Sequence, residues 1–304
     1  MRVIVHGGAG GVPDEPEPRQ AVLDEAAATG AATTDPLEAV ESAVRVLETS
    51  PRFNAGIGGA VQSDGVVRTD AGLMTSDRDI GAACSMPGVE AAVSVARVVA
   101  TETPHVFVSG EHAVDLAEAF GVETGADLLT DEKRKRYEAE SPPQGGPGEH
   151  LEWLETRFGS GDDRAGGADP PERTSEKDAA PDHDTVGAVA SDGESFAAAT
   201  STGGRSFALA GRVGDVPQVG SGFFCTEAGG ASATGAGEDI VRVTLSRRAV
   251  DHLADGLDAQ AAADRAIDEF EDLTGSGAGV IVLGDGTAGS AFNTDGMQTS
   301  VASE

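Results

Sequence analysis

A long polar segment interrupts this chain immediately before one of its most apolar runs. Residues 131–182 are rich in Pro, Gly, Asp and Glu, and apart from a short helix expected near residues 150–158 they carry no regular periodicity. A structureless stretch of this length inside a compact domain is uncommon and is usually a linker or functional. Residues 185–190 then begin a buried strand with no transition. The pattern predicts a flexible acidic linker that ends at Thr185, with a tolerated surface insertion as the alternative.

The apolar run opens with a threonine, and a cut before Thr185 would place its hydroxyl beside a free α-amine. An α-amine has a pKa of about 7.7–8.0, so part of it is a free base at neutral pH. A threonine with its own N-terminal amine is a known form of nucleophile paired with a base. The junction therefore predicts a chain that cleaves itself and then uses Thr185 as an amidohydrolase nucleophile.

The charge balance excludes one class of partner. The 304 residues include 52 Asp and Glu against 21 Lys and Arg, a net charge of -31, whereas phosphate contacts need Lys and Arg. We therefore expect no nucleic-acid partner. So acidic a composition, rich in Ala, Gly, Val and Thr, resembles the proteins of salt-accumulating halophiles, although an ordinary acidic cytosolic protein also fits it.

The same sequence predicts a cytoplasmic location. Residues 2–6 enter a strand at once, which indicates no signal peptide. No apolar run approaches the roughly 20 residues of a membrane helix, so we expect no membrane partner. Cys84 and Cys225 have no metal-site spacing, and reduced thiols are expected.

Local signals predict clustered strands with helices between the clusters, which is typical of an α+β layered domain. A strand at 2–6 should end in the glycine turn 7–11, and a helix at 18–29 should end at Gly30. Asp35 is expected to cap a second helix, and Asp-Gly pairs at 64–65, 192–193 and 285–286 to mark hairpins. Further helices are expected at 87–102, 111–120, 238–254 and 258–272, and further strands at 105–108, 185–191, 195–200, 278–283 and 287–292.

Glycine-rich motifs then recur in a fixed order along the chain. They are residues 6–10 (HGGAG), 53–58 (FNAGIG), 185–190 (TVGAVA), 200–204 (TSTGG) with 211–215 (GRVGD), and 234–238 (TGAGE). In this order they resemble the N-terminal nucleophile amidohydrolases of the plant-type asparaginase, isoaspartyl peptidase and glycosylasparaginase group.

The resemblance implies a four-layer αββα sandwich that is made as a precursor and cut between Asp184 and Thr185. The products would be an α-subunit of residues 1–184 and a β-subunit of residues 185–304. It also implies hydrolysis of the side-chain amide of L-asparagine, of β-aspartyl (isoaspartyl) peptides, or of both, with release of L-aspartate. The family assembles as at least a dimer of αβ units, so a homodimer is expected.

The resemblance also assigns roles to individual residues. Thr185 would be the nucleophile and Thr202 the threonine whose hydroxyl bonds to it. Arg212 would hold the substrate α-carboxylate, for which a planar bidentate donor is the best match. Asp215 would hold the α-ammonium.

Further positions follow from the same resemblance. Thr234 and Gly235 match the oxyanion hole, and Asn54 matches an asparagine that positions the nucleophile. No catalytic metal or cofactor is expected. A structural Na⁺, or K⁺ in a halophile, would bind to main-chain carbonyls of Leu47, Glu48, Ser50, Phe53, Ala55 and Ile57.

Some alternatives stay open. His183 and Asp184 resemble the junction of glycosylasparaginases, in which the aspartate assists cleavage, whereas residues 201–204 (STGG) follow the asparaginase branch. Ammonia, a peptide amine or a glycosylamine could each be the leaving group. An uncleaved, inert homologue acting as a binding protein is the non-enzymatic alternative. A nucleotide-binding oxidoreductase is disfavoured because the first glycine turn lacks the G-x-G-x-x-G spacing and is followed by acidic residues.

Overall fold

The computed structural model describes residues 1–158 and 185–304, which build two β-sheets. The larger sheet has the order β11 (Gly296–Ser303), β1 (Arg2–Gly10), β5 (Val186–Ser191), β6 (Phe196–Thr202), β2 (Arg68–Thr75), β3 (Ile80–Pro87) and β4 (Phe107–Ser109). The smaller sheet has the order β10 (Thr287–Phe292), β9 (Ala278–Gly284), β8 (Gly229–Gly235) and β7 (Phe223–Thr226). Neighbouring strands are antiparallel, except that β4 runs parallel to β3.

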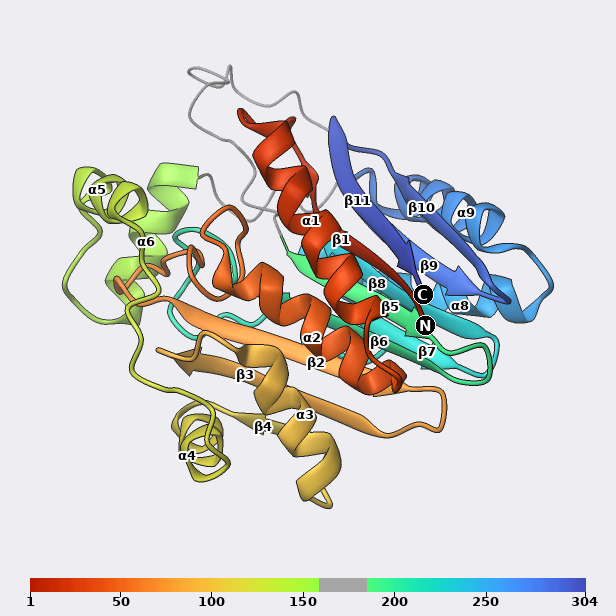
Figure 1. The fold of residues 1–304 in the computed structure, drawn as a ribbon. Helices are drawn as coiled ribbons and strands as arrows, with labels where there is room; N and C mark the ends of the chain where they lie inside the picture. The colour runs from red at the N-terminus through yellow and green to blue at the C-terminus, as the bar shows by residue number, and fades with distance from the viewer. Residues whose placement is uncertain (159–184) are drawn as a thin grey trace.

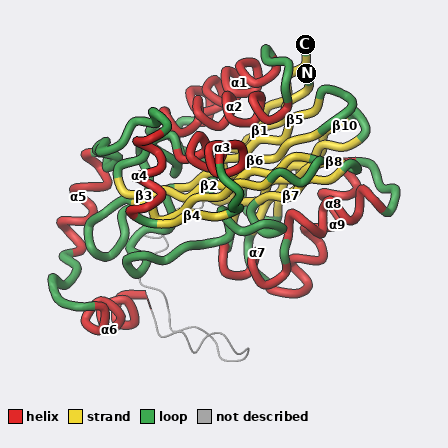
Figure 2. Tube along the Cα trace, turned by 90° about the horizontal axis from the view of Figure 1, so that it is seen from below, coloured by secondary structure: helices red, strands yellow, loops and turns green. Residues whose placement is uncertain are grey.

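The sheets stack face to face and helices cover both outer faces (Figures 1 and 2). On the larger sheet lie α1 (Pro16–Ala31), α2 (Pro36–Thr49) and α3 (Ala92–Glu102), with α4 (Glu111–Ala119) beside β3 and β4. On the smaller sheet lie α8 (Leu245–Ala254) and α9 (Ala259–Thr274). The apolar layer between the sheets includes Ile4, Val189, Phe223 and Ile281. The predicted αββα sandwich is therefore confirmed.

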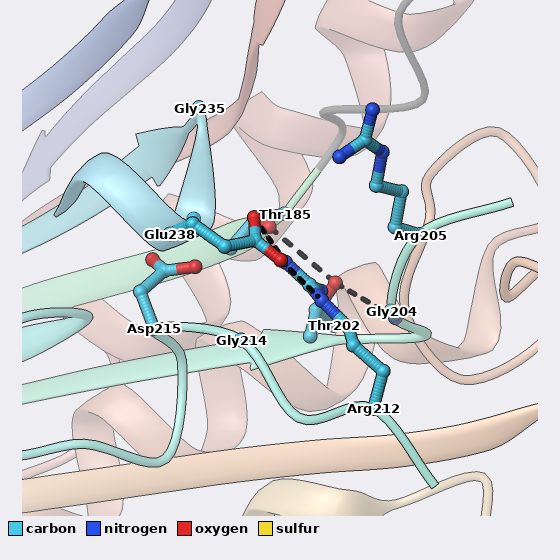
Figure 3. Close-up of a pocket in the computed structure, with 10 residues that line it drawn as sticks. Thr185, Thr202, Gly204, Arg205, Arg212, Gly214, Asp215, Gly235 and Glu238 are labelled. Atoms are coloured by element: carbon cyan, nitrogen blue, oxygen red, sulfur yellow. Dashed lines mark hydrogen bonds and ion pairs between the residues drawn. The ribbon is translucent and has the colours of Figure 1, made fainter. Parts of the chain in front are cut away.

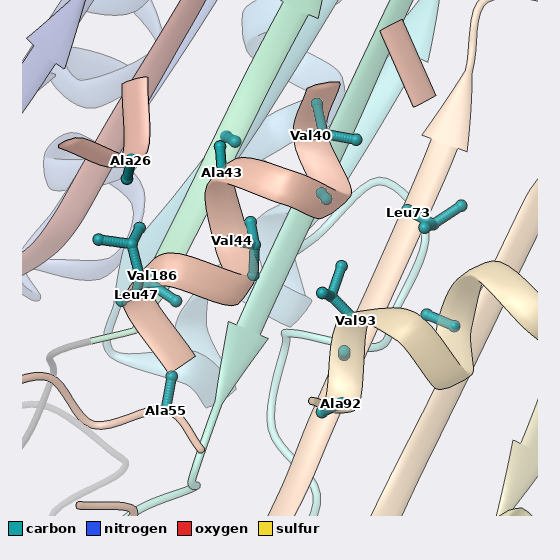
Figure 4. Packing of buried hydrophobic residues seen from close by; sticks show 14 of the residues in the cluster. Ala26, Val40, Ala43, Val44, Leu47, Ala55, Leu73, Ala92, Val93 and Val186 are labelled. Carbon is teal, nitrogen blue, oxygen red and sulfur yellow. The ribbon is translucent and has the colours of Figure 1, made fainter. Parts of the chain in front are cut away.

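Helix α2 shows how the sequence builds one of these layers. The side chain of Asp35 accepts the N–H of Glu38 at 2.9 Å, and Pro36 follows as the first helical residue, as predicted. Val40, Val44 and Leu47 then point toward the larger sheet and are fully buried (Figure 4). Burying one such side chain stabilises the fold by roughly 1.5–3 kcal/mol.

Two glycine-based predictions were wrong. Strand β1 does not end at residue 6 but continues to Gly10, with a shift of register against β11 between His6 and Ala9. Helix α1 does not end at Gly30 but at Ala31. A Cβ on Gly30 would lie 2.8 Å from the carbonyl oxygen of Ala39, so this glycine allows α1 and α2 to approach closely instead of ending the helix.

The first part of the predicted acidic linker is largely helical. Helix α6 (Pro147–Phe158) confirms the short helix expected at residues 150–158, whereas α5 (Asp131–Glu140) was not predicted and corrects the expectation of a flexible linker there. Tyr137 from α5 stacks on Phe207 at 6.4 Å between ring centroids, and Trp153 from α6 meets the same ring at 5.9 Å. These aromatic contacts supply the core that the polar sequence of α5 lacks. Residues 159–184, including His183 and Asp184, lie outside the described residues. Among the described helices, none is long and apolar enough to cross a membrane.

Candidate active site

The β5–β6 hairpin sets the geometry of the predicted nucleophile. Its turn is fixed by Asp192, whose Oδ1 accepts the N–H groups of Glu194 and Ser195, both at 2.8 Å. The resulting register pairs Val186 with Ser201. One residue beyond this pair, Thr185 and Thr202 come together at the same end of two neighbouring strands, although the turn that aligns them lies at the opposite end.

The two threonine hydroxyls are in contact. Thr185 Oγ1 donates to Thr202 Oγ1 at 3.4 Å, and Thr202 Oγ1 also accepts the N–H of Gly204 at 3.1 Å. Both side chains are buried. The Thr185 bond is long, which is common for catalytic hydrogen bonds before substrate is bound.

Asn54 lies behind this pair and holds the strand end in place. Its Nδ2 donates to the Gly204 carbonyl at 2.6 Å, its Oδ1 accepts the Ala60 N–H at 2.7 Å, and its own carbonyl accepts the Gly203 N–H at 2.8 Å. Asn54 does not line the pocket. Its contacts position the turn that follows Thr202.

A pocket at Thr185, which directly precedes β5, brings this residue together with residues from β6, the loop 203–222, β8 and α7 (Gly237–Val243) (Figure 3). It contains five of the predicted site residues, Thr185, Thr202, Arg212, Asp215 and Gly235. Its other lining residues are Gly204, Arg205, Gly214, Gly237 and Glu238.

Arg212 is held by an acidic partner that the sequence reasoning did not assign. Its Nε and a terminal nitrogen donate to the two carboxylate oxygens of Glu238 at 2.9 and 2.8 Å. Burial alone would raise the pKa of Glu238, but this ion pair and a contribution from Arg205 hold that pKa below its usual value. The backbone of the loop is clamped by Gln62, which bonds to the Gly211 N–H and the Arg212 carbonyl.

Asp215 presents an unsatisfied carboxylate at the pocket. The residue is buried, and its Oδ2 has no hydrogen-bond partner within the described part of the chain. Burial raises the pKa of Asp215 to about 6, with Arg212 opposing this shift and Glu238 adding to it. A buried carboxylate with one unpartnered oxygen has a strong preference for a cationic ligand.

The predicted oxyanion-hole residues are divided between the pocket and the layer behind it. Gly235 lines the pocket with φ of +137°, a backbone conformation that favours glycine. Thr234 is fully buried, does not line the pocket, and its Oγ1 accepts the Ala9 N–H at 3.4 Å. The backbone at Gly235 is therefore nearer to the reacting position than the Thr234 hydroxyl.

His6 of the first glycine motif lies between the two sheets and not in the pocket. Its Nε2 lies 2.9 Å from Ser232 Oγ, which lies 2.6 Å from Thr200 Oγ1. Because Thr200 donates its proton to the Gly222 carbonyl at 2.7 Å, Ser232 must donate to Thr200, and His6 Nε2 must donate to Ser232. Burial lowers the pKa of His6 to about 3, so the ring is neutral. The HGGAG motif therefore contributes His6 to a buried hydrogen-bond network between the two sheets, near Thr185.

Three polar residues near the site were missed. Glu238 belongs to the TGAGE motif and Arg205 follows TSTGG directly, so both had a sequence signal. Asp70 had none, because a lone aspartate in a strand has no pattern of its own. It is the register partner of Thr202 and accepts the Ser85 N–H at 2.7 Å, and burial raises its pKa to about 7.

The predicted cation loop after α2 is tightly wound and rich in main-chain carbonyls. The Glu48 carbonyl accepts the Ile57 N–H at 2.9 Å, and the Ser50 carbonyl accepts the Phe53 N–H at 3.4 Å. A Cβ on Gly56 would lie 2.2 Å from the Glu48 oxygen, so only glycine fits there. Each carbonyl keeps a second lone pair, and uncharged oxygens are the donor type suited to an alkali cation. The residues present fit such an ion.

Comparison with known proteins extends these observations. A family model described as asparaginase matches residues 1–304. The chain is 38% identical to the plant-type L-asparaginase of Pyrococcus furiosus over 305 residues, which cover 98% of this chain and 94% of that protein. It is 38% identical to the plant-type L-asparaginase of Pyrobaculum calidifontis over 275 residues, covering 88% and 84%. It is 33% identical to the isoaspartyl peptidase/L-asparaginase of Danio rerio over 313 residues, covering 99% and 92%.

Proposed function

Because the chain belongs to the asparaginase family along its whole length, we propose that it is a self-cleaving amidohydrolase. Its substrates are L-asparagine and β-aspartyl peptides, and its product is L-aspartate. One observation carries this proposal above the others. Thr185, directly before strand β5, shares a pocket with its hydroxyl partner Thr202, with Arg212, and with Asp215, whose Oδ2 is unpartnered.

The reaction follows from the positions of these groups. Cleavage of the Asp184–Thr185 bond frees the Thr185 amine, which accepts the proton of the Thr185 hydroxyl. The hydroxyl oxygen attacks the side-chain carbonyl carbon, the C–N bond breaks, and the leaving amine takes up the proton. Water then hydrolyses the resulting ester, which releases L-aspartate and restores Thr185.

The aspartyl half of the substrate is held by opposite charges. The α-ammonium pairs with Asp215, whose free Oδ2 is the only unpartnered carboxylate oxygen lining the described pocket that is also buried. The α-carboxylate pairs with the part of the Arg212 guanidinium that Glu238 leaves available, since Glu238 occupies Nε and one terminal nitrogen.

The remaining roles belong to the same proposal. The Gly235 N–H, which lines the pocket, stabilises the oxyanion, for which one donor contributes about 10²–10³ in rate, and the buried Thr234 hydroxyl supports this backbone from behind. A structural Na⁺ or K⁺ bound by carbonyls of residues 47–57 would rigidify the loop that carries Asn54. We further propose a homodimer of αβ units and a cytoplasmic location.

Release of L-aspartate from L-asparagine tests this function. The wild type should produce aspartate and ammonia in equal amounts, and Thr185→Ala should produce neither. Arg212→Ala should still cleave itself but lose substrate binding, because its role begins only with substrate. Efficient turnover by Arg212→Ala would contradict the assigned site, and aspartate release by Thr185→Ala would contradict the nucleophile.

A further inference from the structure

We propose that Arg205 binds the carboxylate of an amino-acid or peptide leaving group, so that β-aspartyl peptides with a free carboxylate are preferred over L-asparagine. This inference rests on the proposed function of the same pocket. It concerns the half of the substrate that Arg212 and Asp215 do not contact. It therefore addresses which amine leaves, a question that the motifs alone leave open.

The backbone of Arg205 is anchored to the catalytic centre. The preceding residue, Gly204, donates its N–H to Thr202 Oγ1 at 3.1 Å and accepts from Asn54 at 2.6 Å. The Arg205 carbonyl accepts the Ala208 N–H at 3.1 Å, which closes a turn. These bonds hold the backbone of Arg205 close to the Thr202 hydroxyl, which contacts the nucleophile.

The charge of Arg205 is available to a ligand. It lines the pocket, its side chain is exposed, and within the ranges 1–158 and 185–304 no carboxylate forms an ion pair with it. Arg212, the other cation of the pocket, is already paired with Glu238 at 2.8 Å. On a chain with a net charge of -31, an unpaired arginine at a pocket provides a rare local attraction for an anion.

The position of Arg205 matches the leaving-group side. In Figure 3, Asp215 and Arg205 lie on opposite sides of the Thr185–Thr202 pair, while Gly235 lies above it. A substrate with its α-ammonium at Asp215 and its carbonyl oxygen toward Gly235 must direct the amide nitrogen away from both. That direction leads toward Gly204 and Arg205.

The chemistry of the possible leaving groups then separates them. Ammonia has no carboxylate, and a glycosylamine presents uncharged hydroxyls. In a β-aspartyl dipeptide, the carboxylate carbon of the leaving amino acid lies about 2.5 Å from the scissile nitrogen. A guanidinium matches a carboxylate in planar geometry and donor spacing, so Arg205 favours this class alone.

The test compares catalytic efficiency on matched substrates. We would measure kcat/KM for β-aspartyl-leucine, β-aspartyl-leucine amide and L-asparagine with the self-cleaved wild type, Arg205→Gln and Arg205→Lys. The matched control is Arg247→Gln, which removes the same charge from the exposed face of α8, where Arg247 pairs with Asp251 at 3.5 Å. Self-cleavage of each variant shows that it has folded.

We expect the ratio of kcat/KM for the dipeptide to that for L-asparagine to fall about tenfold in Arg205→Gln and less in Arg205→Lys. Arg247→Gln should keep the wild-type ratio, and the wild type should prefer the free dipeptide over its amide. An unchanged ratio in Arg205→Gln, or an equal loss on all substrates, would overturn the role of Arg205 alone. A wild type inactive on every substrate would instead overturn the proposed function.

Discussion

Three acidic side chains interact with Arg212, one of the two arginines that line this pocket. Glu238 satisfies two nitrogens of Arg212, whereas Asp215 and Asp70 influence it through space. The Arg212–Glu238 pair holds the guanidinium in one orientation before substrate arrives, which reduces the entropy lost on binding. Asp215 remains the carboxylate with a free buried oxygen. A zwitterionic amino acid fits this arrangement better than a simple anion.

The ionisation of Asp215 should control substrate affinity below neutral pH. Its raised pKa of about 6 means that the carboxylate becomes protonated, and loses the α-ammonium, as pH falls through that value. The Thr185 amine, with a pKa of about 8, must also be neutral. We therefore expect kcat/KM to fall about tenfold per pH unit below pH 8 and about a hundredfold per unit below pH 6.

Asp215→Asn separates the two limbs of this profile. It should lower kcat/KM at pH 7.5 by about 10–150-fold, the effect of losing a hydrogen bond to a charged group. The steeper limb below pH 6 should disappear while the limb of the amine remains. A wild-type profile with a single slope down to pH 5 would show that Asp215 does not titrate in this range.

Among the individual site residues, those that belong to sequence motifs were predicted, whereas those whose role depends on the folded loop were not. Thr185, Thr202, Arg212 and Asp215 were predicted and do share a pocket. The pairing of Glu238 with Arg212 joins residues 26 positions apart, and no spacing rule connects a loop to a helix start. Asp70 reaches the site only through strand pairing.

Elements with strong local signals were predicted, and elements made of small polar residues were not. The β5–β6 and β9–β10 hairpins follow their Asp-Gly turns, and α9 follows the helical pattern expected at 258–272. By contrast, β7 and β8 contain mainly Phe, Cys, Thr, Gly, Ala and Ser and have no alternating pattern. Their strand conformation comes from burial between α8 and the larger sheet, which is a tertiary effect.

The contact between α3 and β3 depends on one glycine. A Cβ on Gly81 would lie 1.9 Å from the Ala96 carbonyl oxygen and 2.7 Å from the Ala100 nitrogen, both backbone atoms of α3. Gly81→Ala must therefore displace the helix, and we expect a loss of about 1–3 kcal/mol in the free energy of unfolding. Thermal or denaturant unfolding of the purified protein would measure it.

Gly146→Ala provides the comparison, because a Cβ there meets no atom within 4 Å. It should change the free energy of unfolding by less than about 0.5 kcal/mol. If Gly81→Ala were equally neutral, α3 would not pack on β3 as closely as described.

The charge of the whole molecule should make its stability depend on salt. With a net charge of -31, like charges repel across the surface, and this repulsion is screened as the Debye length falls from about 10 Å at 0.1 M to about 3 Å at 1 M salt. We expect the Tm to rise by several degrees over this range in NaCl and in choline chloride alike. A Tm that does not change with ionic strength would contradict the expectation that the acidic composition reflects adaptation to high salt.

The chain topology predicts what happens to the two halves after cleavage. Strand β1, which precedes the cut, lies between β5 and β11, which both follow it. Strand β2 likewise pairs with β6. Each half therefore supplies strands that the other half pairs with, and the two fragments should migrate together in size-exclusion chromatography.

The most direct test of a self-generated Thr185 nucleophile is to purify the protein in molar salt, denature it and measure the mass of its chains. The Thr185→Ala variant is measured in the same way. The wild type should give two fragments, residues 1–184 and 185–304, and the variant should give one chain of 304 residues. A folded wild type that remains one chain and releases no aspartate, or a variant that is cut at the same bond, would contradict the account.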